Sequence, residues 1–164
     1  MGVLTDYFRA ADAASVVRAL VREEGDSPIA HGRSGFDGVE AKGVDPCVVL
    51  GKLIAAIRAV PWRVDLVGET TVWPTSPMPG PDDPDAEESP WATGPWVVEL
   101  HAPVRDTLAA VHDAEVPGIV ASWAQAEELH GAAAADMQPV AEGIIGLARR
   151  ARAAGEQLYC WMCL

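Results

Sequence analysis

The last nine residues, Glu156 to Leu164 (E-Q-L-Y-C-W-M-C-L), constrain the fold of this chain more than any other segment. They follow a glycine that ends a helical pattern, and their short, apolar and aromatic character predicts a buried β-strand. Side chains alternate along a strand and so define two faces. One face carries Leu158, Cys160, Met162 and Leu164, and the other carries Tyr159, Trp161 and Cys163. Because neither face is polar, we expect a central strand that is covered on both sides.

Length and composition predict a single domain spanning residues 1–164. A chain of 164 residues, 49% of them hydrophobic, can bury a sizeable core. No apolar run approaches the ~18 residues of a membrane span, and the opening M-G-V-L-T-D-Y-F lacks the basic head and apolar run of a signal peptide. We therefore expect a cytoplasmic protein with no membrane partner. The three cysteines are too few for a disulfide framework and fit free thiols.

The chain is strongly acidic, with a formal net charge of −12 from 24 acids and 12 bases. Nucleic-acid binding needs a basic surface that displaces counterions from phosphates, so we expect no nucleic-acid partner. A basic protein partner matches the charge better. The imbalance is concentrated between Arg63 and Arg105, where no Lys or Arg occurs. Eight acids lie in that interval: Asp65, Glu69, Asp82, Asp83, Asp85, Glu87, Glu88 and Glu99.

The N-terminal half of the chain alternates predicted strands and helices. A short run of β-prone residues predicts a strand at Val3 to Phe8, and Asp12 then caps an amphipathic helix. Asp45-Pro46 has the cap and first-turn proline of a second helix, which Pro61 stops. The apolar stripe of the first helix is Val16, Val17, Leu20 and Val21. A short strand is predicted within 36–40, and one or two more within 63–73.

The C-terminal half begins with a predicted surface loop at residues 74–95. It holds seven of the thirteen prolines, and because proline removes backbone donors it disfavours a strand there. Three helices follow: one after Pro103, one from Pro117 to Gly131, and one from Asp136 to Gly155. The predicted fold class is therefore α+β, a single domain in which a small mixed sheet, including the N- and C-terminal strands, packs with about five helices.

Four short motifs resemble the YfbM-like family of uncharacterised bacterial proteins. They are the opening M-G-V-L-T-D-Y-F, the helix G-V-D-P-C-V-V-L-G-K-L, the segment V-V-E-L-H-A-P-V-R-D-T-L-A-A-V, and the closing A-R-A-A-G-E-Q-L-Y-C-W. The order of elements along most of the chain is similar as well. The resemblance implies an α+β fold. It brings no catalytic residue, cofactor or substrate to this chain.

Motifs of common catalytic and metal sites are weak or missing. Cys160 and Cys163 match C-x-x-C, but positions i and i+3 of a strand point to opposite faces, so the two sulfurs cannot share a disulfide or an ion. The histidines His31, His101, His112 and His130 show no H-x-x-x-H spacing, and Gly32, Gly35 and Gly38 fit no phosphate-binding loop. We therefore predict no catalytic residue, no metal site and no cofactor. These patterns favour a non-enzymatic role and leave an enzyme open as the alternative.

Acids and tryptophans around residues 74–95 form the candidate binding site. Aromatic side chains beside carboxylates can recognise a basic or cationic partner, and they can equally be anchors that hold a long loop to the core. The candidate binding residues are Trp73, Asp82, Asp83, Glu87, Glu88, Trp91, Trp96, Glu99 and His101.

Two functions from different classes follow from these residues. The first is a non-enzymatic interaction protein whose acidic face binds a basic protein, for example as an antitoxin or immunity protein. The alternative is a small-ligand-binding protein or an enzyme with a pocket between helices and sheet. That pocket would use Trp91, Trp96, Glu99 and His101.

Overall fold

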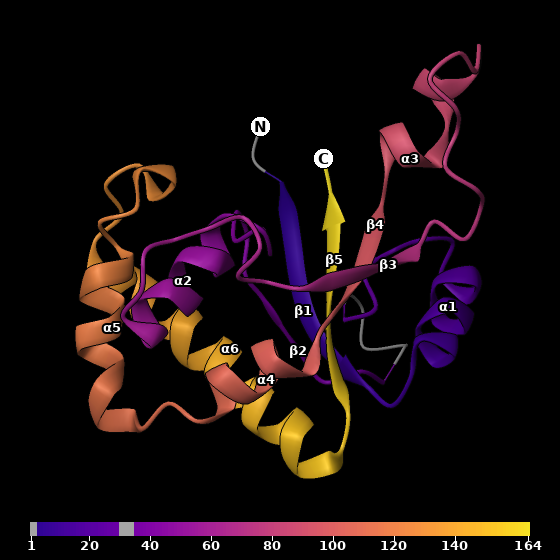
Figure 1. Cartoon of the computed structure of the whole chain (residues 1–164). Coiled ribbons are helices and arrows are strands. Elements are labelled where there is room, and N and C mark those ends of the chain that lie inside the picture. The colour runs from indigo at the N-terminus through magenta and orange to yellow at the C-terminus, as the bar shows by residue number, and fades with distance from the viewer. Residues whose placement is uncertain (1–2, 30–34) are drawn as a thin grey trace.

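The computed structural model describes residues 3–29 and 35–164, which contain a five-stranded sheet and six α-helices (Figure 1). The strand order is β2-β1-β5-β4-β3. The strands are β1 (Leu4–Ala10), β2 (Gly38–Glu40), β3 (Glu69–Trp73), β4 (Trp96–Leu100) and β5 (Gln157–Cys163). The helices are α1 (Ala13–Arg22), α2 (Val49–Arg58), α3 (Pro90–Thr93), α4 (Ala102–Ala109), α5 (Val116–Trp123) and α6 (Ala134–Ala154). The predicted α+β class is confirmed.

The C-terminal strand is the central strand of the sheet, as predicted. β5 pairs with β1 along its whole length, from Leu4 opposite Cys163 to Ala10 opposite Gln157. On its other side it pairs with β4, from Trp96 opposite Met162 to Leu100 opposite Leu158. Without β5, the remaining strands would form two separate pairs, β1-β2 and β3-β4.

The expected mixture of parallel and antiparallel strands is wrong, because every strand pair in the described part of the chain is antiparallel. β4 and β5 are separated by three helices, a connection long enough for a parallel crossover. Those helices instead return the chain to the end of the sheet where β4 finishes. β5 begins at that end, and Leu158 pairs with Leu100.

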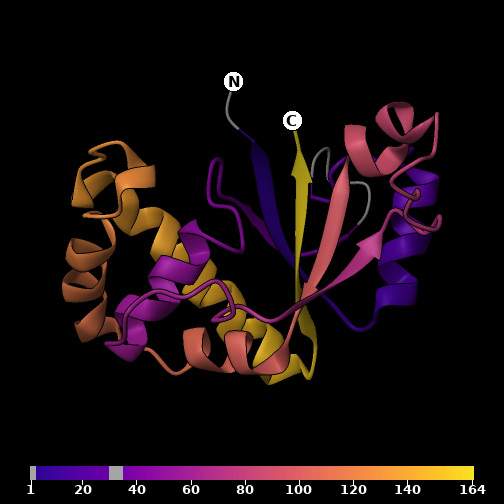
Figure 2. The ribbon, with the colours of Figure 1, turned by 45° about the horizontal axis from the view of Figure 1, so that its top comes forward.

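The two faces of the sheet are covered unequally (Figure 2). Helices α2, α4, α5 and α6 lie over one face, whereas α1 and neighbouring loops cover the other. Leu158 and Cys160 of β5 belong to the larger core on the first face, and Tyr159 and Trp161 belong to the smaller core on the second. The predicted alternation is confirmed from Leu158 to Cys163, and side chains on both faces are buried. The prediction is wrong for Leu164, which follows β5 and is 72% exposed.

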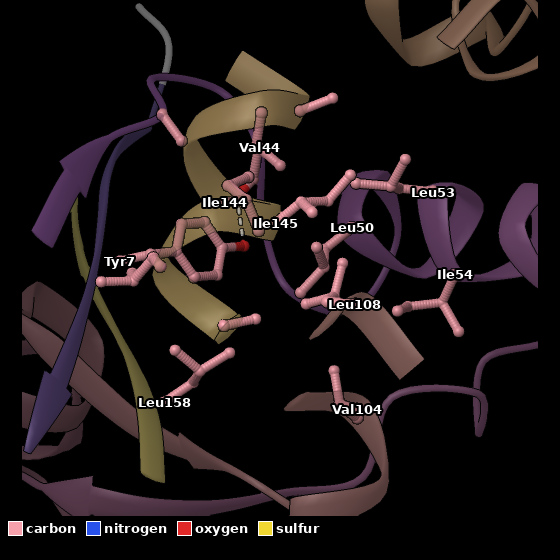
Figure 3. Packing of buried hydrophobic residues seen from close by; sticks show 14 of the residues in the cluster. Tyr7, Val44, Leu50, Leu53, Ile54, Val104, Leu108, Ile144, Ile145 and Leu158 are labelled. Carbon is pink, nitrogen blue, oxygen red and sulfur yellow. Dashed lines mark hydrogen bonds between the residues drawn. The ribbon is translucent and has the colours of Figure 1, made fainter. Parts of the chain in front are cut away.

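The larger core contains Tyr7, the one hydroxyl-bearing side chain among the residues labelled in Figure 3. Its hydroxyl donates a hydrogen bond to the Val44 carbonyl oxygen at 2.7 Å (Figure 3). Complete burial removes the phenol from water, which raises its pKa well above the ordinary value and keeps it neutral. The bond satisfies the polar group that would otherwise destabilise an apolar interior.

Helix boundaries follow the capping residues at several predicted positions. The Asp12 carboxylate accepts the Ser15 backbone N–H at 2.7 Å, and Asp45 accepts those of Val48 and Val49 ahead of α2. Gly155 ends α6 with a left-handed backbone, φ +68°, which glycine adopts without strain.

The structure differs from the local expectations at four places. Val21 is 64% exposed and lies outside the α1 stripe. Of the one or two strands expected within 63–73, β3 forms, whereas residues 63–66 make a turn in which the Leu66 N–H bonds to the Arg63 carbonyl at 3.1 Å. α5 ends at Trp123 and does not continue to Gly131, because the chain turns there and enters the 3-10 helix η4 (Glu127–Leu129). Strand β4 was not predicted.

Candidate functional site

Residues 74–95, here called the acidic arm, connect β3 to β4 and extend beyond the end of the sheet (Figure 1). The arm carries a 3-10 turn, η2 (Ala86–Glu88), and the four-residue helix α3. It contains no strand. Its prolines lack the N–H groups that a strand partner would need, so the segment leaves the sheet at Pro74 and returns at Trp96.

The arm's carboxylates face solvent. None of the ion pairs found among residues 3–29 and 35–164 involves them. The Asp83 carboxylate accepts the backbone N–H of Asp85 at 3.0 Å, which fixes one turn of the tip. Five acids are exposed here: Asp82, Asp83, Asp85, Glu87 and Glu88. They form a compact group of negative charge without an internal counter-charge in the described structure.

The tryptophans of the arm are partly buried and bond to the arm's own backbone. The Trp91 indole N–H donates to the Ser76 carbonyl oxygen at 2.9 Å, and the Trp96 indole N–H donates to the Trp91 carbonyl oxygen at 3.0 Å. Gly94 has φ +72°, and a Cβ there would lie 3.1 Å from the Trp96 ring. These bonds join parts of the arm to one another, and neither acceptor lies in the core. They give the arm a defined local shape.

The base of the arm meets the α1 side of the protein. A Cβ on Gly25 would lie 3.2 Å from the Pro95 ring, so the two segments are in direct contact. The Gly25 carbonyl oxygen in turn accepts the indole N–H of Trp161 in β5 at 2.9 Å. The arm is therefore connected through Gly25 to the central strand.

The remaining candidate residues occupy two different places. Trp73 ends β3 beside the arm and packs against the smaller core. Glu99, within β4, accepts the Tyr159 hydroxyl at 2.8 Å; burial first, and this bond second, raise the pKa of Tyr159. His101 is exposed at the far end of β4, where its Nε2 lies 3.0 Å from the Thr70 hydroxyl.

The structure does not unite the residues of the alternative pocket. Trp96 and His101 lie at opposite ends of β4, roughly 16 Å apart along a strand that rises about 3.3 Å per residue. Glu99 is engaged by Tyr159 between them. The four cavities known from the described residues are lined by other side chains.

Sequence analysis did not predict a cavity of about 550 Å³ that lies between α2 and α5. Its lining includes Lys52, Trp62, Ser122 and Gln125. The signal in the sequence was an exposed apolar run, A-V-P-W-R-V, directly after α2, in which Val60, Trp62 and Val64 remain exposed.

The two C-terminal thiols lie as predicted, on opposite faces of β5. Cys160 is fully buried in the larger core, and Cys163 packs beside the smaller one. Burial raises the pKa of Cys160 far above the ordinary thiol value, so this sulfur stays protonated. Among residues 3–29 and 35–164, no group of three or more His, Cys, Asp or Glu is placed to hold a metal ion. His31 and Gly32 lie outside the described residues.

No helix in the described ranges is both long and apolar enough to span a membrane.

Comparisons with known proteins give one structural match to report. No protein-family model and no curated protein matches the chain. The crystal structure of YfbM, a protein of unknown function from Escherichia coli, is similar with a TM-score of 0.41 and 12% sequence identity, over 97% of this chain and 99% of that one. The match brings no activity or site residue to this chain.

Proposed function

We propose that this chain is a non-enzymatic interaction protein that presents its acidic arm to a basic protein, in the manner of an antitoxin or immunity protein. The observation that carries the proposal is the arm itself. Its five exposed carboxylates stand outside the ion pairs of the described residues, on a loop whose ends are held by indole hydrogen bonds.

Electrostatics favours a basic partner for such a surface. Negative charges grouped on a projecting segment steer a positive surface towards them and raise the association rate, an effect that salt screens. The chain has a net charge of −12, so the rest of the molecule reinforces this field. A cation that reaches the base of the arm would also meet the partly exposed rings of Trp91 and Trp96.

The anchored tryptophans favour binding in a second way. A free loop loses conformational entropy when a partner orders it, and that loss weakens the complex. The bonds from Trp91 to Ser76 and from Trp96 to Trp91 order both ends of the arm before any partner arrives. The arm is therefore suited to contact a partner with little rearrangement.

A pull-down with matched charge variants tests the proposal. The arm variant carries Asp82→Asn, Asp83→Asn, Asp85→Asn, Glu87→Gln and Glu88→Gln. The control variant neutralises five exposed acids elsewhere and changes the net charge equally: Glu24→Gln, Asp26→Asn, Glu40→Gln, Glu127→Gln and Asp136→Asn. The wild-type chain, used as bait in extract of its own cell, should retain a basic protein at low salt and release it at high salt.

The two variants then separate a specific contact from general attraction. We expect the arm variant to capture at least tenfold less of the basic protein than the wild type does. The control variant should capture as much as the wild type. Equal loss in both variants would mean that net charge alone attracts the protein. Recovery of no basic protein at any salt concentration would contradict the proposed function.

A further inference from the structure

The cavity between α2 and α5 has the size and the lining of a small-molecule site. Trp123 fastens the two helices together, since its indole N–H donates to the Val49 carbonyl oxygen at 2.9 Å. The small side chains of Ala55, Ala56 and Ala59 leave the space open along α2. Its volume of about 550 Å³ is within the range of roughly 300–1,000 Å³ that ligand pockets show.

Trp62 forms the wall of this cavity, and the helix is adapted to admit it. A Cβ on Gly51 would lie 2.8 Å from the indole nitrogen of Trp62, so only glycine allows the ring to lie against α2. Glycine inside a helix costs about 1 kcal/mol relative to alanine. The indole N–H also approaches the Cys47 carbonyl oxygen at 3.4 Å. Trp62 nevertheless remains 38% exposed, and its ring offers a flat apolar surface.

A single cation marks the polar end of the cavity. The Lys52 ammonium lies 5.8 Å from the centre of the Trp62 ring and forms an ion pair with Glu128 of η4. The residues that line the cavity in the described structure include Lys52 and no carboxylate. Ser122 and Gln125 add hydrogen-bonding groups from the α5 side. On a chain with a net charge of −12, this is a local site suited to an anionic group.

From this arrangement we infer that the cavity binds a flat aromatic carboxylate. Its ring lies against Trp62 and the alanine floor, and its carboxylate pairs with the Lys52 ammonium. In the free protein, the Lys52 ammonium pairs with the Glu128 carboxylate. The carboxylate of the ligand replaces that of Glu128 in this ion pair. This site lies on different elements from the acidic arm and is independent of the proposed function.

Substituting the two members of the Lys52–Glu128 ion pair should change the ligand affinity in opposite directions. Glu128→Gln removes the competing carboxylate and should increase the affinity for an aromatic carboxylate. Lys52→Gln removes the ammonium and should reduce that affinity. A site that merely collects apolar molecules would respond to neither change.

The probe is 2-naphthoate, and the matched neutral control is 2-naphthylmethanol, which has the same ring system without the charge. Binding is measured by titration calorimetry and by quenching of tryptophan fluorescence. We expect 2-naphthoate to bind the wild-type protein, Lys52→Gln to weaken it at least tenfold, and Glu128→Gln to strengthen it severalfold. The affinity for 2-naphthylmethanol should stay within twofold in both variants, and Trp62→Phe should remove most of the quenching.

Three results would contradict the inference. The first is that 2-naphthoate does not bind, and the second is that 2-naphthoate binds no more tightly than 2-naphthylmethanol. The third is that Lys52→Gln leaves the affinity for 2-naphthoate unchanged. Sedimentation that shows a dimer abolished by Trp62→Ala would make the groove an interface between two copies. Circular dichroism of each variant verifies that the fold is intact.

Discussion

Trp161 and Trp91 each donate an indole N–H to a backbone carbonyl at 2.9 Å, but they belong to regions of opposite character. Trp161 is buried in the central strand and bonds to Gly25, 136 residues away along the chain. Trp91 is partly exposed in the acidic arm and bonds to Ser76, 15 residues away. The same bond therefore joins distant elements in one region and only shapes a local segment in the other.

The carboxylates of the two regions differ in the same way. Asp37 lies between two guanidinium groups, at 2.7 Å from Arg9 of β1 and 2.6 Å from Arg150 of α6, and so links the sheet to a helix. The five acids of the arm have no such counter-charge in the described structure. In the body of the protein, charged groups contribute to stability. In the arm they are exposed to solvent.

The largest expected effect is the loss of the fold in Trp161→Asp. The change places an ionised carboxylate in a buried position of β5 and removes the bond to Gly25. We expect no soluble folded protein, measured by expression and circular dichroism. Trp91→Asp is the matched control and should remain soluble and folded. A folded Trp161→Asp protein would mean that the central strand tolerates charge. Trp161 and Trp91 would then not differ in their importance for the fold.

Trp96→Ala should have an intermediate effect, because Trp96 is partly buried where the arm returns to the sheet. We expect a loss of about 1–2 kcal/mol in the free energy of unfolding, below the 3–5 kcal/mol of a fully buried aromatic residue. Urea denaturation measures the change. Trp91→Phe, which removes one local hydrogen bond, should cost about 0.5–1.5 kcal/mol. A larger loss in Trp91→Phe than in Trp96→Ala would show that the arm stabilises the core.

Asp37→Asn should lower stability by about 1–2 kcal/mol at pH 7, in a pH-dependent way. Hydrogen bonds from Arg150 and then Arg9 lower the pKa of Asp37 from 3.8 to about 2. Because the folded-state pKa lies below the unfolded one, the stabilisation is complete above about pH 4. It disappears as the pH falls from about 4 to about 2. Urea midpoints across pH should therefore converge for wild type and variant at low pH, and a constant difference would contradict the ion-pair explanation.

Neutralising the arm should have the smallest effect on stability. The variant with Asp82, Asp83, Asp85, Glu87 and Glu88 converted to amides should unfold within about 0.5 kcal/mol of the wild type, because exposed carboxylates without ion-pair partners contribute little. The amide of Asp83→Asn keeps an oxygen that can accept the Asp85 N–H. Repulsion among the five charges makes a small gain the expected direction. Thermal melts at low salt measure it. A clear destabilisation would show that these acids are structural.

Predictions from the sequence succeeded where the deciding contacts are local. Alternation placed Cys160 and Cys163 on opposite faces of a central strand, and short-range caps placed the helices after Asp12 and Asp45. β4 was missed because its five residues follow directly on a proline-rich segment, although Trp96 to Leu100 is a β-prone run.

The cavity beside α2 could not be predicted, because it depends on contacts between distant residues. Lys52 meets Glu128 across 76 residues, and Trp123 reaches Val49 across 74. Helical periodicity shows which side of α2 is apolar, but it does not show that Gly51 admits the ring of Trp62. Such pairings become visible only in three dimensions.

The position of β5 between β1 and β4 also has a consequence for biosynthesis. As the chain leaves the ribosome, β1-β2 and β3-β4 can form only as two isolated ladders, each with an open edge, until residues 157–163 emerge. Pairings between such distant segments are slow to form. A chain that ends before Gln157 should therefore be sensitive to proteases and dependent on chaperones, and emergence of residues 157–163 should join the two ladders into one sheet.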